Sequence, residues 1–265
     1  MTDEQFKAVA LFDLDNTLLD DHKNVPDVNV AALRQLHQNG VLTAFSTGRN
    51  RYELLSLKNA LQVDAMVAAN GSDVFLGRQH VYQQTMPTSV LERLKREADD
   101  SEIPIGFYTG DQAALTLIND NTIAQYQHIR QRSAEVRPDF FRHAAVCMLH
   151  LYVPQTTAGD QLADDFRAAF PELSFYRNSR YSLDVVSHGM TKATGLSQLM
   201  TRPELVGLPT YAFGDGNNDL EVLQAATYGI AMGNALPSVK QAADYVTTDN
   251  LHAGIPKALR HFGLI

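Results

Sequence analysis

Cysteine and tryptophan are almost absent from this 265-residue sequence, which contains one cysteine, Cys147, and no tryptophan. A single cysteine excludes an intrachain disulfide, and scarce cysteine is typical of proteins from a reducing compartment. The segment Met1–Lys7 is polar and acidic rather than basic and then apolar, so no signal peptide is expected. We therefore expect a cytoplasmic protein.

Basic residues and long apolar runs are also scarce. The chain has 22 Lys and Arg against 30 Asp and Glu, a net charge of −8, so there is no basic excess to neutralise nucleic acid. The longest apolar stretch, Ala144–Val153, is interrupted by His150 and is too short to span a bilayer. We expect neither a nucleic-acid nor a membrane partner. A small anionic substrate needs only a local cationic site, so the overall charge does not argue against one.

The apolar residues that are present, 45% of the chain, suffice for a sizeable core, and the length indicates one or two domains. Short apolar runs at Ala8–Phe12, Val41–Phe45 and Ala65–Ala69 are typical of buried strands. Helical spacing separates them, first from about residue 30 to Gly40 and then from about Arg51 to Leu61. Alternating strands and helices predict an α/β fold with a parallel sheet and right-handed crossovers.

A different pattern occupies residues 83–187. It combines two helical patterns with strands joined by hairpin-like turns, such as Gly110-Asp111, and predicts an antiparallel sheet with helices on one face. The first pattern returns after about Ser187. We therefore expect a core domain of residues 1–82 and 188–265, interrupted by an inserted α+β domain of residues 83–187. The strands expected in the insert are Ile103–Thr109, Ala113–Ile118, Ala144–Val153, Leu173–Tyr176 and Tyr181–Val186.

Four polar stretches gather four carboxylates, a hydroxyl and an ammonium. Three of them directly follow apolar runs, where the strands of an α/β protein end and its active-site loops begin. Two unit negative charges about 4 Å apart repel by roughly 4 kcal/mol at an effective dielectric near 20. Such a cluster implies a cation, and oxygen-only ligands favour Mg²⁺. The stretches are Asp13–Thr17, Ser46–Arg49, Lys192 and Gly214–Asp219.

The first stretch offers two carboxylates with different roles. Asp13, at a strand end, is a candidate nucleophile for phosphate chemistry. Asp15 lies two residues on, a spacing that returns a side chain to the same side of an extended chain, and could transfer protons. The alternative is that Asp13–Thr17 is an ordinary helix cap or turn.

The second stretch, Thr47-Gly48-Arg49, would place a hydroxyl and free backbone amides where an anion binds at a helix N-terminus. Taken alone, this tripeptide reads better as a plain N-cap. Arg49 could reach a substrate oxygen or could lie in solvent.

Lys192, near a helix start, could neutralise a phosphate. Asp215 and Asp219, four residues apart across a glycine-containing turn, could ligate or support a metal, or could form an Asx turn that caps the next helix. Asn70 and Asn218 are further candidate substrate contacts, although a local backbone hydrogen bond is the default for Asn70 and for His188.

Together the four stretches resemble the haloacid dehalogenase superfamily, and their order and spacing resemble its Cof-type branch. The resemblance covers about residues 8–82 and 188–265. The segment 83–187 falls where that branch carries a large type-two cap, between the third core strand and the lysine motif. No catalytic position departs from the pattern. The matching motifs are Asp13–Leu18, Thr47–Arg49, Gly189–Ala193 and Gly214–Asp219.

The resemblance implies a Rossmann-like core with Mg²⁺ held by Asp13, the Asp15 backbone carbonyl and Asp215. Asp219 would support the metal shell. It also implies that Asp13 attacks phosphorus and that Asp15 acts as acid and then base. Thr47 and Lys192 would hold the phosphoryl oxygens, and the cap would exclude water and choose the leaving group.

The expected function is therefore a Mg²⁺-dependent phosphatase for small phosphorylated metabolites, with sugar phosphates expected first. Asp15 favours phosphatase or phosphomutase chemistry over dehalogenation, which needs no acid at this place. Two alternatives are a phosphomutase acting on hexose phosphates and a catalytically inactive phosphometabolite-binding protein. Tyr108, Arg180 and Tyr181 are candidates for selectivity, because their polar tips lie beside turns of the insert.

Overall fold

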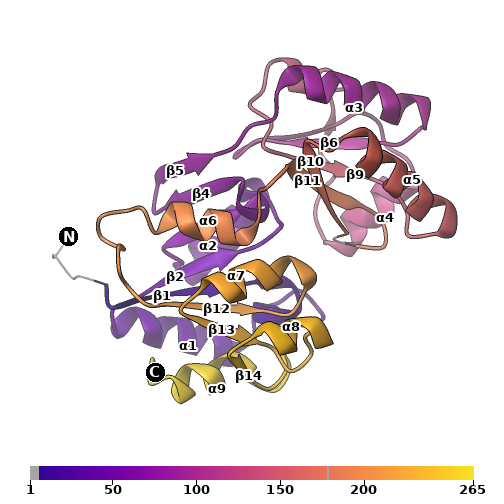
Figure 1. Ribbon diagram of the computed structural model, residues 1–265. Helices are drawn as coiled ribbons and strands as arrows, with labels where there is room; N and C mark the ends of the chain where they lie inside the picture. The colour runs from indigo at the N-terminus through magenta and orange to yellow at the C-terminus, as the bar shows by residue number, and fades with distance from the viewer. Residues whose placement is uncertain (1–5, 178) are drawn as a thin grey trace. The chain divides into compact units, whose positions relative to one another are not determined.

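The computed structural model describes residues 6–177 and 179–265. Most of the polar segment Met1–Lys7 lies outside the described residues, as does Asn178, which falls between the expected strands Leu173–Tyr176 and Tyr181–Val186. The chain divides into two compact units (Figure 1). The first unit comprises the chain up to Arg49, Leu54–Tyr82 and Thr191–Ile265, and the second comprises Asn50–Glu53 and Gln83–Met190.

The first unit is built on one sheet, which has eight strands among the described residues. Its central strand β1 (Ala8–Phe12) pairs in parallel with β12 and with β2. Strand β3 continues the parallel sheet on one side, and β13 and β14 continue it on the other. A hairpin of β4 and β5 closes one edge, with β4 antiparallel to β3. The remaining strands are β2 (Val41–Ser46), β3 (Ala65–Ala68), β4 (Asp73–Leu76), β5 (Gln79–Gln83), β12 (Thr210–Gly214), β13 (Tyr228–Ala231) and β14 (Tyr245–Val246).

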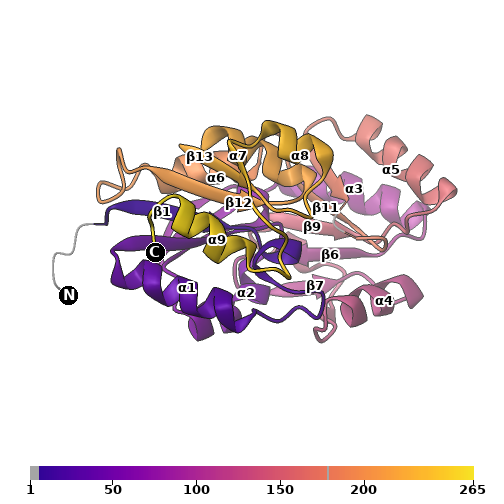
Figure 2. The ribbon, with the colours of Figure 1, turned by 90° about the horizontal axis from the view of Figure 1, so that it is seen from below.

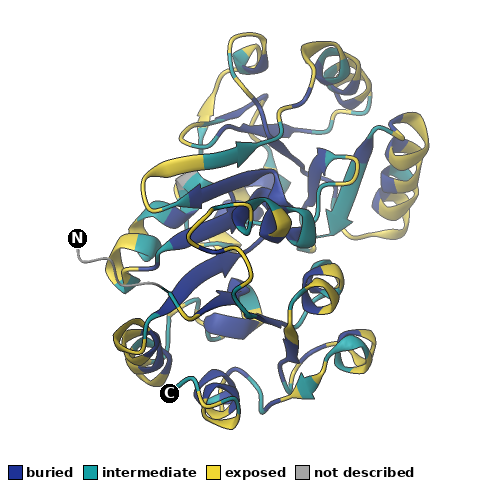
Figure 3. Ribbon diagram, turned by 60° about the vertical axis from the view of Figure 1, so that its left-hand side comes forward, coloured by how far each residue is buried: buried dark blue, intermediate teal, exposed yellow. Residues whose placement is uncertain are grey.

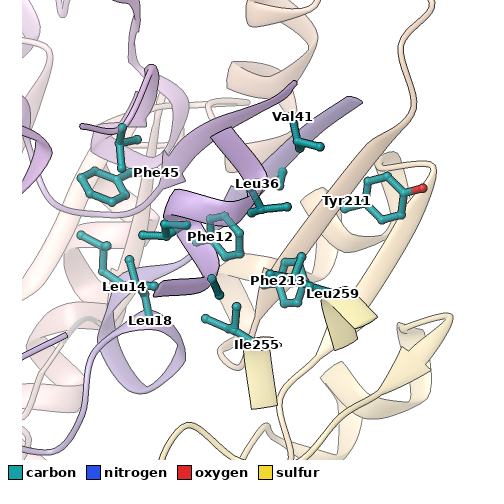
Figure 4. Packing of buried hydrophobic residues seen from close by; sticks show 14 of the residues in the cluster. Phe12, Leu14, Leu18, Leu36, Val41, Phe45, Tyr211, Phe213, Ile255 and Leu259 are labelled. Atoms are coloured by element: carbon teal, nitrogen blue, oxygen red, sulfur yellow. The ribbon is translucent and has the colours of Figure 1, made fainter. Parts of the chain in front are cut away.

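Helices cover both faces of this sheet, which explains why β1 reads as an unbroken apolar run. Phe12 and its alternate neighbours belong to a cluster with residues of α1, α2 and α9. Figure 4 shows Phe12 in this cluster together with Leu36 of α1 and with Ile255 and Leu259 of α9. Val9 and Leu11 face the other way, toward α6, α7 and α8. Figure 2 shows α7 and α8 on the side of the sheet opposite α1. The helices are α1 (Asp27–Gln38), α2 (Arg51–Leu61), α6 (Lys192–Leu199), α7 (Leu220–Ala225), α8 (Pro237–Ala242) and α9 (Gly254–His261).

The second unit is built on a mostly antiparallel sheet in the order β10-β11-β9-β6-β7-β8, in which only the β7–β8 pair is parallel. Helices α3 (Thr88–Asp100) and α5 (Thr157–Ala169) pack on one face. The strands are β6 (Ile105–Tyr108), β7 (Ala113–Leu115), β8 (Glu135–Val136), β9 (Met148–Leu151), β10 (Leu173–Arg177) and β11 (Leu183–Ser187).

Helix α4 (Asp120–His128) corrects the expectation of helices on one face only. Its Tyr126 packs with Leu115 and Tyr152 on the face opposite α3 and α5. The helix begins at a capping box in which Asn119 and Thr122 bond reciprocally. Its sequence mixes polar and apolar residues too evenly for periodicity to reveal it.

Burial follows the same layering in each unit. Figure 3 shows that the central strands are buried and that the helices expose their outer sides, whereas strands such as β5 and β8 are partly or fully exposed. Within the described part of the chain, no helix combines the length and the apolarity that crossing a bilayer requires. The predicted α/β fold, with a parallel-sheet core interrupted by an α+β insert, is confirmed.

Candidate active site

The candidate site of the first unit is formed by loops at the carboxyl ends of adjacent parallel strands. Asp13 follows β1, Thr47 follows β2 and Asp215 follows β12. Because these strands are neighbours and run in the same direction, their ends meet at one edge of the sheet. Lys192 is the first residue of α6, which Thr191 caps through its side-chain oxygen. Segments far apart in the sequence are therefore brought to one place.

Lys192 is the centre of a buried charge cluster. Its Nζ donates to Asp13 Oδ1 and to Asp219 Oδ1, both at 2.6 Å, and the side chain is fully buried. Burial acts to lower the pKa of Lys192, but the charges of Asp13 and Asp219 outweigh it and raise the pKa. The ammonium is therefore permanently charged at neutral pH.

Three carboxylates surround this one ammonium. Asp13, Asp215 and Asp219 offer oxygen atoms that all lie within 4.8 Å of one another. Burial raises the pKa of Asp13 well above its usual range, and Asp219 and Asp215 add to this while Lys192 opposes it. Burial and then Asp219 raise the pKa of Asp215 to about 6. An excess of buried negative charge with only oxygen donors fits a hard divalent cation such as Mg²⁺.

Asp219 also builds the loop that follows β12. Its Oδ2 accepts hydrogen bonds from the backbone N–H groups of Asp215, at 2.9 Å, and Gly216, at 3.0 Å. A Cβ on Gly214 would lie 2.3 Å from Asp219 Cγ, so only glycine fits there. With Oδ1 on Lys192 and Oδ2 on two amides, Asp219 shapes the site and contributes its charge.

The loop after β1 forms a single wide turn, η1 (Leu14–Leu18), in which Asn16 has φ of 62°. The hydroxyl of Thr17 donates to Asp215 Oδ1 at 2.9 Å and so orients this carboxylate. Asn234 Nδ2 donates to the carbonyl of Asn16 at 2.8 Å, and Asn250 Nδ2 donates to that of Leu19 at 3.0 Å. Side chains near the C-terminal end of the chain thereby hold the loop that carries Asp13.

Asp15 lies outside the buried cluster, with its side chain 38% exposed. Arg49 donates two hydrogen bonds to the Asp15 carboxylate, from Nε to Oδ2 at 2.9 Å and from Nη2 to Oδ1 at 2.7 Å. Lys23 Nζ donates to the same Oδ1 at 2.7 Å. Burial acts to raise the pKa of Asp15, but Arg49 and then Lys23 lower it to about 2. Asp15 is therefore ionised in this arrangement.

Thr47 forms a local turn ahead of α2 rather than the helix N-cap expected of the tripeptide taken alone, because α2 begins at Arg51 and the Asn50 side chain accepts the Glu53 N–H at 3.1 Å. Thr47 is buried, and its Oγ1 accepts a hydrogen bond from the Arg49 N–H at 3.1 Å. The hydroxyl can still donate its own proton to an anion. This turn is compatible with the anion-binding role expected for Thr47, and Gly48 lies within the same turn.

The loop after β3 is held in an uncommon conformation. Ala69, Asn70 and Gly71 all have left-handed φ values, of 50°, 49° and 90°. A Cβ on Gly71 would lie 2.0 Å from the Thr191 carbonyl oxygen, so the loop packs tightly on the start of the Lys192 helix. Asn70 Oδ1 accepts a hydrogen bond from Asn218 Nδ2 at 3.2 Å. The two candidate substrate amides are therefore brought together.

Candidates outside this group lie in the second unit. His188 is exposed. Tyr108 is buried, and its hydroxyl lies within hydrogen-bonding distance of His150, Tyr126 and Tyr152. Arg180 is exposed beside Tyr181, with the guanidinium 5.7 Å from the ring centroid.

Sequence reasoning assigned no role to Thr17 or Lys23. Thr17 lies within the first motif, so its position was a usable signal. Lys23 carries no periodic or motif signal, and only its contact with Asp15 reveals it.

Comparison with known proteins identifies the class of the chain. Residues 10–259 match the haloacid dehalogenase-like hydrolase family, so the chain belongs to this family, as the sequence predicted.

The chain is 29% identical over 265 residues to a Bacillus subtilis (strain 168) protein named "Putative phosphatase YkrA", which covers 97% of this chain and 98% of the relative. Two solved structures are similar along the whole chain. The phosphatase BT1666 from Bacteroides thetaiotaomicron has a TM-score of 0.85 and 26% identity, covering 100% of this chain and 98% of its own. The HAD subclass IIB sugar phosphatase BT4131 has a TM-score of 0.85 and 25% identity, covering 97% of this chain and 100% of its own.

Proposed function

We propose that this hydrolase is a Mg²⁺-dependent phosphatase that acts on small phosphorylated metabolites, sugar phosphates first, through an aspartyl-phosphate intermediate. The observation that carries the proposal is the buried contact of Lys192 with Asp13 and Asp219, beside Asp215. A phosphate monoester needs both a nucleophile and local positive charge. Similarity to the sugar phosphatase BT4131 supports the substrate class.

The carboxylates of this cluster are the proposed metal ligands. Asp13 and Asp215 would hold Mg²⁺ together with the Asp15 backbone carbonyl, and Asp219 would support them. The bound ion would neutralise phosphoryl oxygens that the carboxylates alone would repel. Lys192 would supply the remaining positive charge from the buried side.

In the first half of the reaction, an Asp13 carboxylate oxygen would form a bond to phosphorus while the ester P–O bond breaks. Asp15 would give its proton to the departing oxygen, so the leaving group departs as a neutral alcohol. Thr47 and Lys192 would hold the phosphoryl oxygens during transfer, with Gly48 and Arg49 alongside. Asn70 and Asn218 are the proposed polar contacts for the rest of the substrate.

In the second half, a water oxygen would attack phosphorus and the bond from phosphorus to Asp13 would break. Asp15 would take the proton of this water, which restores the acid for the next cycle. The ionised Asp15 gripped by Arg49 and Lys23 suits this second half. To act as the acid of the first half, its carboxyl must turn away from both cations.

We propose that the insert, residues 83–187, acts as a cap domain that chooses the leaving group. Arg180 and Tyr181 remain candidates for this selection. Tyr108 is the weakest of the three, because its hydroxyl is engaged within the second unit. The net charge of −8 supports a small phosphorylated metabolite over nucleic acid as the partner, and a cytoplasmic location is part of the proposal.

The test is phosphate release from sugar phosphates, nucleotides and 4-nitrophenyl phosphate, with Mg²⁺ and with EDTA. Asp13→Asn is the matched blank, because it removes the nucleophile and keeps the side-chain volume. We expect Mg²⁺-dependent release from the wild type and none from the variant. Appreciable turnover by cleanly purified Asp13→Asn would mean that another residue attacks phosphorus. Conversion of a hexose 1-phosphate to its 6-phosphate without net release would replace the phosphatase with a phosphomutase. Binding without turnover in either assay would make the protein a phosphometabolite-binding protein.

A further inference from the structure

Lys23 lies on a turn that is built to present it. The Asp20 carboxylate accepts hydrogen bonds from the backbone N–H groups of His22, at 2.9 Å, and Asn24, at 2.8 Å. The backbones of Asp20 and Asn24 bond to each other, and the Lys23 N–H donates to the Asp20 carbonyl, both at 2.9 Å. Within this turn Lys23 has φ of 62°, a left-handed conformation that a lysine rarely adopts. Backbone strain of this kind concentrates at functional sites.

The side chain of Lys23 is also placed unlike that of an ordinary surface lysine. It is only 18% exposed, and its Nζ lies 2.7 Å from Asp15 Oδ1. Lysine is among the residues least often buried, because its ammonium is strongly hydrated. The turn therefore places the ammonium of Lys23 in a largely buried position next to Asp15, the proposed proton donor.

The charges of the site divide into an inner and an outer set. With all three carboxylates ionised, the inner set, Asp13, Asp215, Asp219 and Lys192, has a formal net charge of −2, which one divalent cation would neutralise. The outer set, Asp15, Lys23 and Arg49, has a net charge of +1. Two cations therefore share the Asp15 carboxylate, which belongs to the residue that would meet the leaving-group oxygen, while the Asp20 carboxylate of the same turn bonds to backbone N–H groups.

We propose that Lys23, together with Arg49, binds a second anionic group carried by the leaving group. Such a substrate is a phosphate monoester with a carboxylate or a further phosphate elsewhere in the molecule. This inference rests on the proposed phosphatase function and narrows its substrate class. When Asp15 turns toward the leaving-group oxygen, the two cations exchange one carboxylate for the anionic group of the substrate. Arg49 supplies a planar fork for two oxygens, and Lys23 supplies a point charge.

The competing explanation is that Lys23 only orients Asp15. The two explanations differ in how substrates respond. Loss of an orienting residue slows every substrate alike, whereas loss of an anion-binding residue penalises only those substrates that carry the second charge.

The experiment compares matched pairs of substrates that differ in this charge. The pairs are glycerol 3-phosphate with 3-phosphoglycerate and glucose 6-phosphate with 6-phosphogluconate. The variants are Lys23→Met, which removes the charge, and Lys23→Arg, which restores it. Lys95→Met is the control, because Lys95 has a similar ion pair, 2.6 Å to Asp99, and is 19% exposed. Thermal unfolding establishes that each variant is folded.

We expect the wild type to favour the anionic member of at least one pair by about tenfold in kcat/KM. Lys23→Met should cut this ratio by about tenfold, mainly through KM, while Lys23→Arg and Lys95→Met keep it. Calorimetric binding to Asp13→Asn, with and without Lys23→Met, should show the same loss for 6-phosphogluconate and none for glucose 6-phosphate.

Equal wild-type rates within both pairs would overturn the inference. An equal fall for both members in Lys23→Met would overturn it in favour of the orienting role. Hydrolysis of 4-nitrophenyl phosphate distinguishes a failure of the proposed substrate class from a failure of the proposed phosphatase function. If this substrate is cleaved in a Mg²⁺- and Asp13-dependent way while the ratio stays at one, only the substrate class fails. If neither this substrate nor any member of the two pairs releases phosphate, the proposed function itself fails.

Discussion

Each unit contains a buried polar cluster with an ion pair, and the two clusters differ in charge balance. In the first unit, Lys192 pairs with Asp13 and Asp219, and a third carboxylate, that of Asp215, lies close to both of them. In the second unit, His150 Nε2 lies 3.1 Å from Asp184 Oδ1, and its Nδ1 lies 3.1 Å from the Tyr108 hydroxyl. The histidine there has its own carboxylate partner, with Glu53 as a weaker second influence on its pKa, and burial raises the pKa of Tyr108, which keeps its hydroxyl neutral.

The two clusters are also built differently. His150 and Asp184 are directly opposite each other in the β9–β11 pairing, and Gly106 faces His150 from β6. A Cβ on Gly106 would lie 3.0 Å from the Tyr108 ring, so the glycine leaves room for that side chain. Regular strand pairing thus assembles this cluster. The Lys192 cluster instead needs loops, and its partners Lys192 and Asp13 are 179 residues apart.

Charge balance distinguishes a functional cluster from a structural one. The pair in the second unit satisfies itself within the fold, as buried polar groups normally do. The cluster of the first unit has more carboxylates than cations, so ionising all of them costs free energy unless a cation binds there. An imbalance of this kind indicates a site, whereas balance indicates support of the fold.

Removal of the Lys192 charge should have the largest effect, on both activity and stability. Lys192→Met keeps much of the buried aliphatic stem but leaves Asp13 and Asp219 without their partner. We expect kcat to fall by about 10³-fold. Without Mg²⁺, the free energy of unfolding should fall by about 3–5 kcal/mol. Phosphate release and urea unfolding measure the two effects, and the exposed Lys257→Met is the control. Retention of a tenth of the activity would remove Lys192 from the mechanism.

Disruption of the His150–Asp184 pair should lower the stability of the second unit without a comparable loss of phosphatase activity. Asp184→Asn leaves His150 without its buried counter-charge, and we expect the second unit to lose about 3 kcal/mol of unfolding free energy. Circular dichroism in urea measures the change. Asp164→Asn, at an exposed pair with Arg167, should change it by less than about 0.5 kcal/mol. A loss of 4-nitrophenyl phosphate hydrolysis beyond the unfolded fraction would contradict a purely structural role.

Mg²⁺ should stabilise the folded protein through the Lys192 cluster, and this stabilisation should not require the His150–Asp184 pair. A ligand that binds only the folded state, at a hundred times its Kd, adds about 2.7 kcal/mol to the free energy of unfolding. We expect the melting temperature to rise with Mg²⁺ in the wild type and in Asp184→Asn, but not in Asp215→Asn. An undiminished rise in Asp215→Asn would place the ion elsewhere. EDTA should reverse the rise and abolish phosphate release together.

The smallest effect concerns pH. Burial acts to lower the pKa of His150, but Asp184, helped by Glu53, outweighs burial and raises it above the usual 6.5. The folded state therefore favours the charged histidine. The stability that this charge adds is fully present below pH 6.5 and is lost as pH rises through the raised folded value. With saturating Mg²⁺, the wild type should lose more stability between pH 6 and 9 than His150→Gln does. Parallel pH profiles would refute this assignment.

Much of the core could be predicted from the sequence because its signals are local. The strand Ala8–Phe12 and the helix Arg51–Leu61 have the predicted bounds. Strand β3 ends one residue before its prediction, since Ala69 turns into a left-handed conformation that apolar character does not reveal. In the second unit β9 is shorter than Ala144–Val153, because strand length depends on pairing as well as on hydrophobicity.

The sequence alone was enough to predict the parallel core, its interruption by an insert, the polar motifs of Asp13 and Asp215 at strand ends, and Lys192 near a helix start. These follow from periodicity and from residue types that are close neighbours along the chain. Three features became visible only in the tertiary structure. Lys23 and Arg49 donate hydrogen bonds to Asp15, and Thr17 orients Asp215. Helix α4 lies on the second face of its sheet. Such contacts depend on strand register and on the backbone conformation of loops. A one-dimensional pattern of apolar and polar residues specifies neither, because the contacts join groups that meet only when the chain is folded.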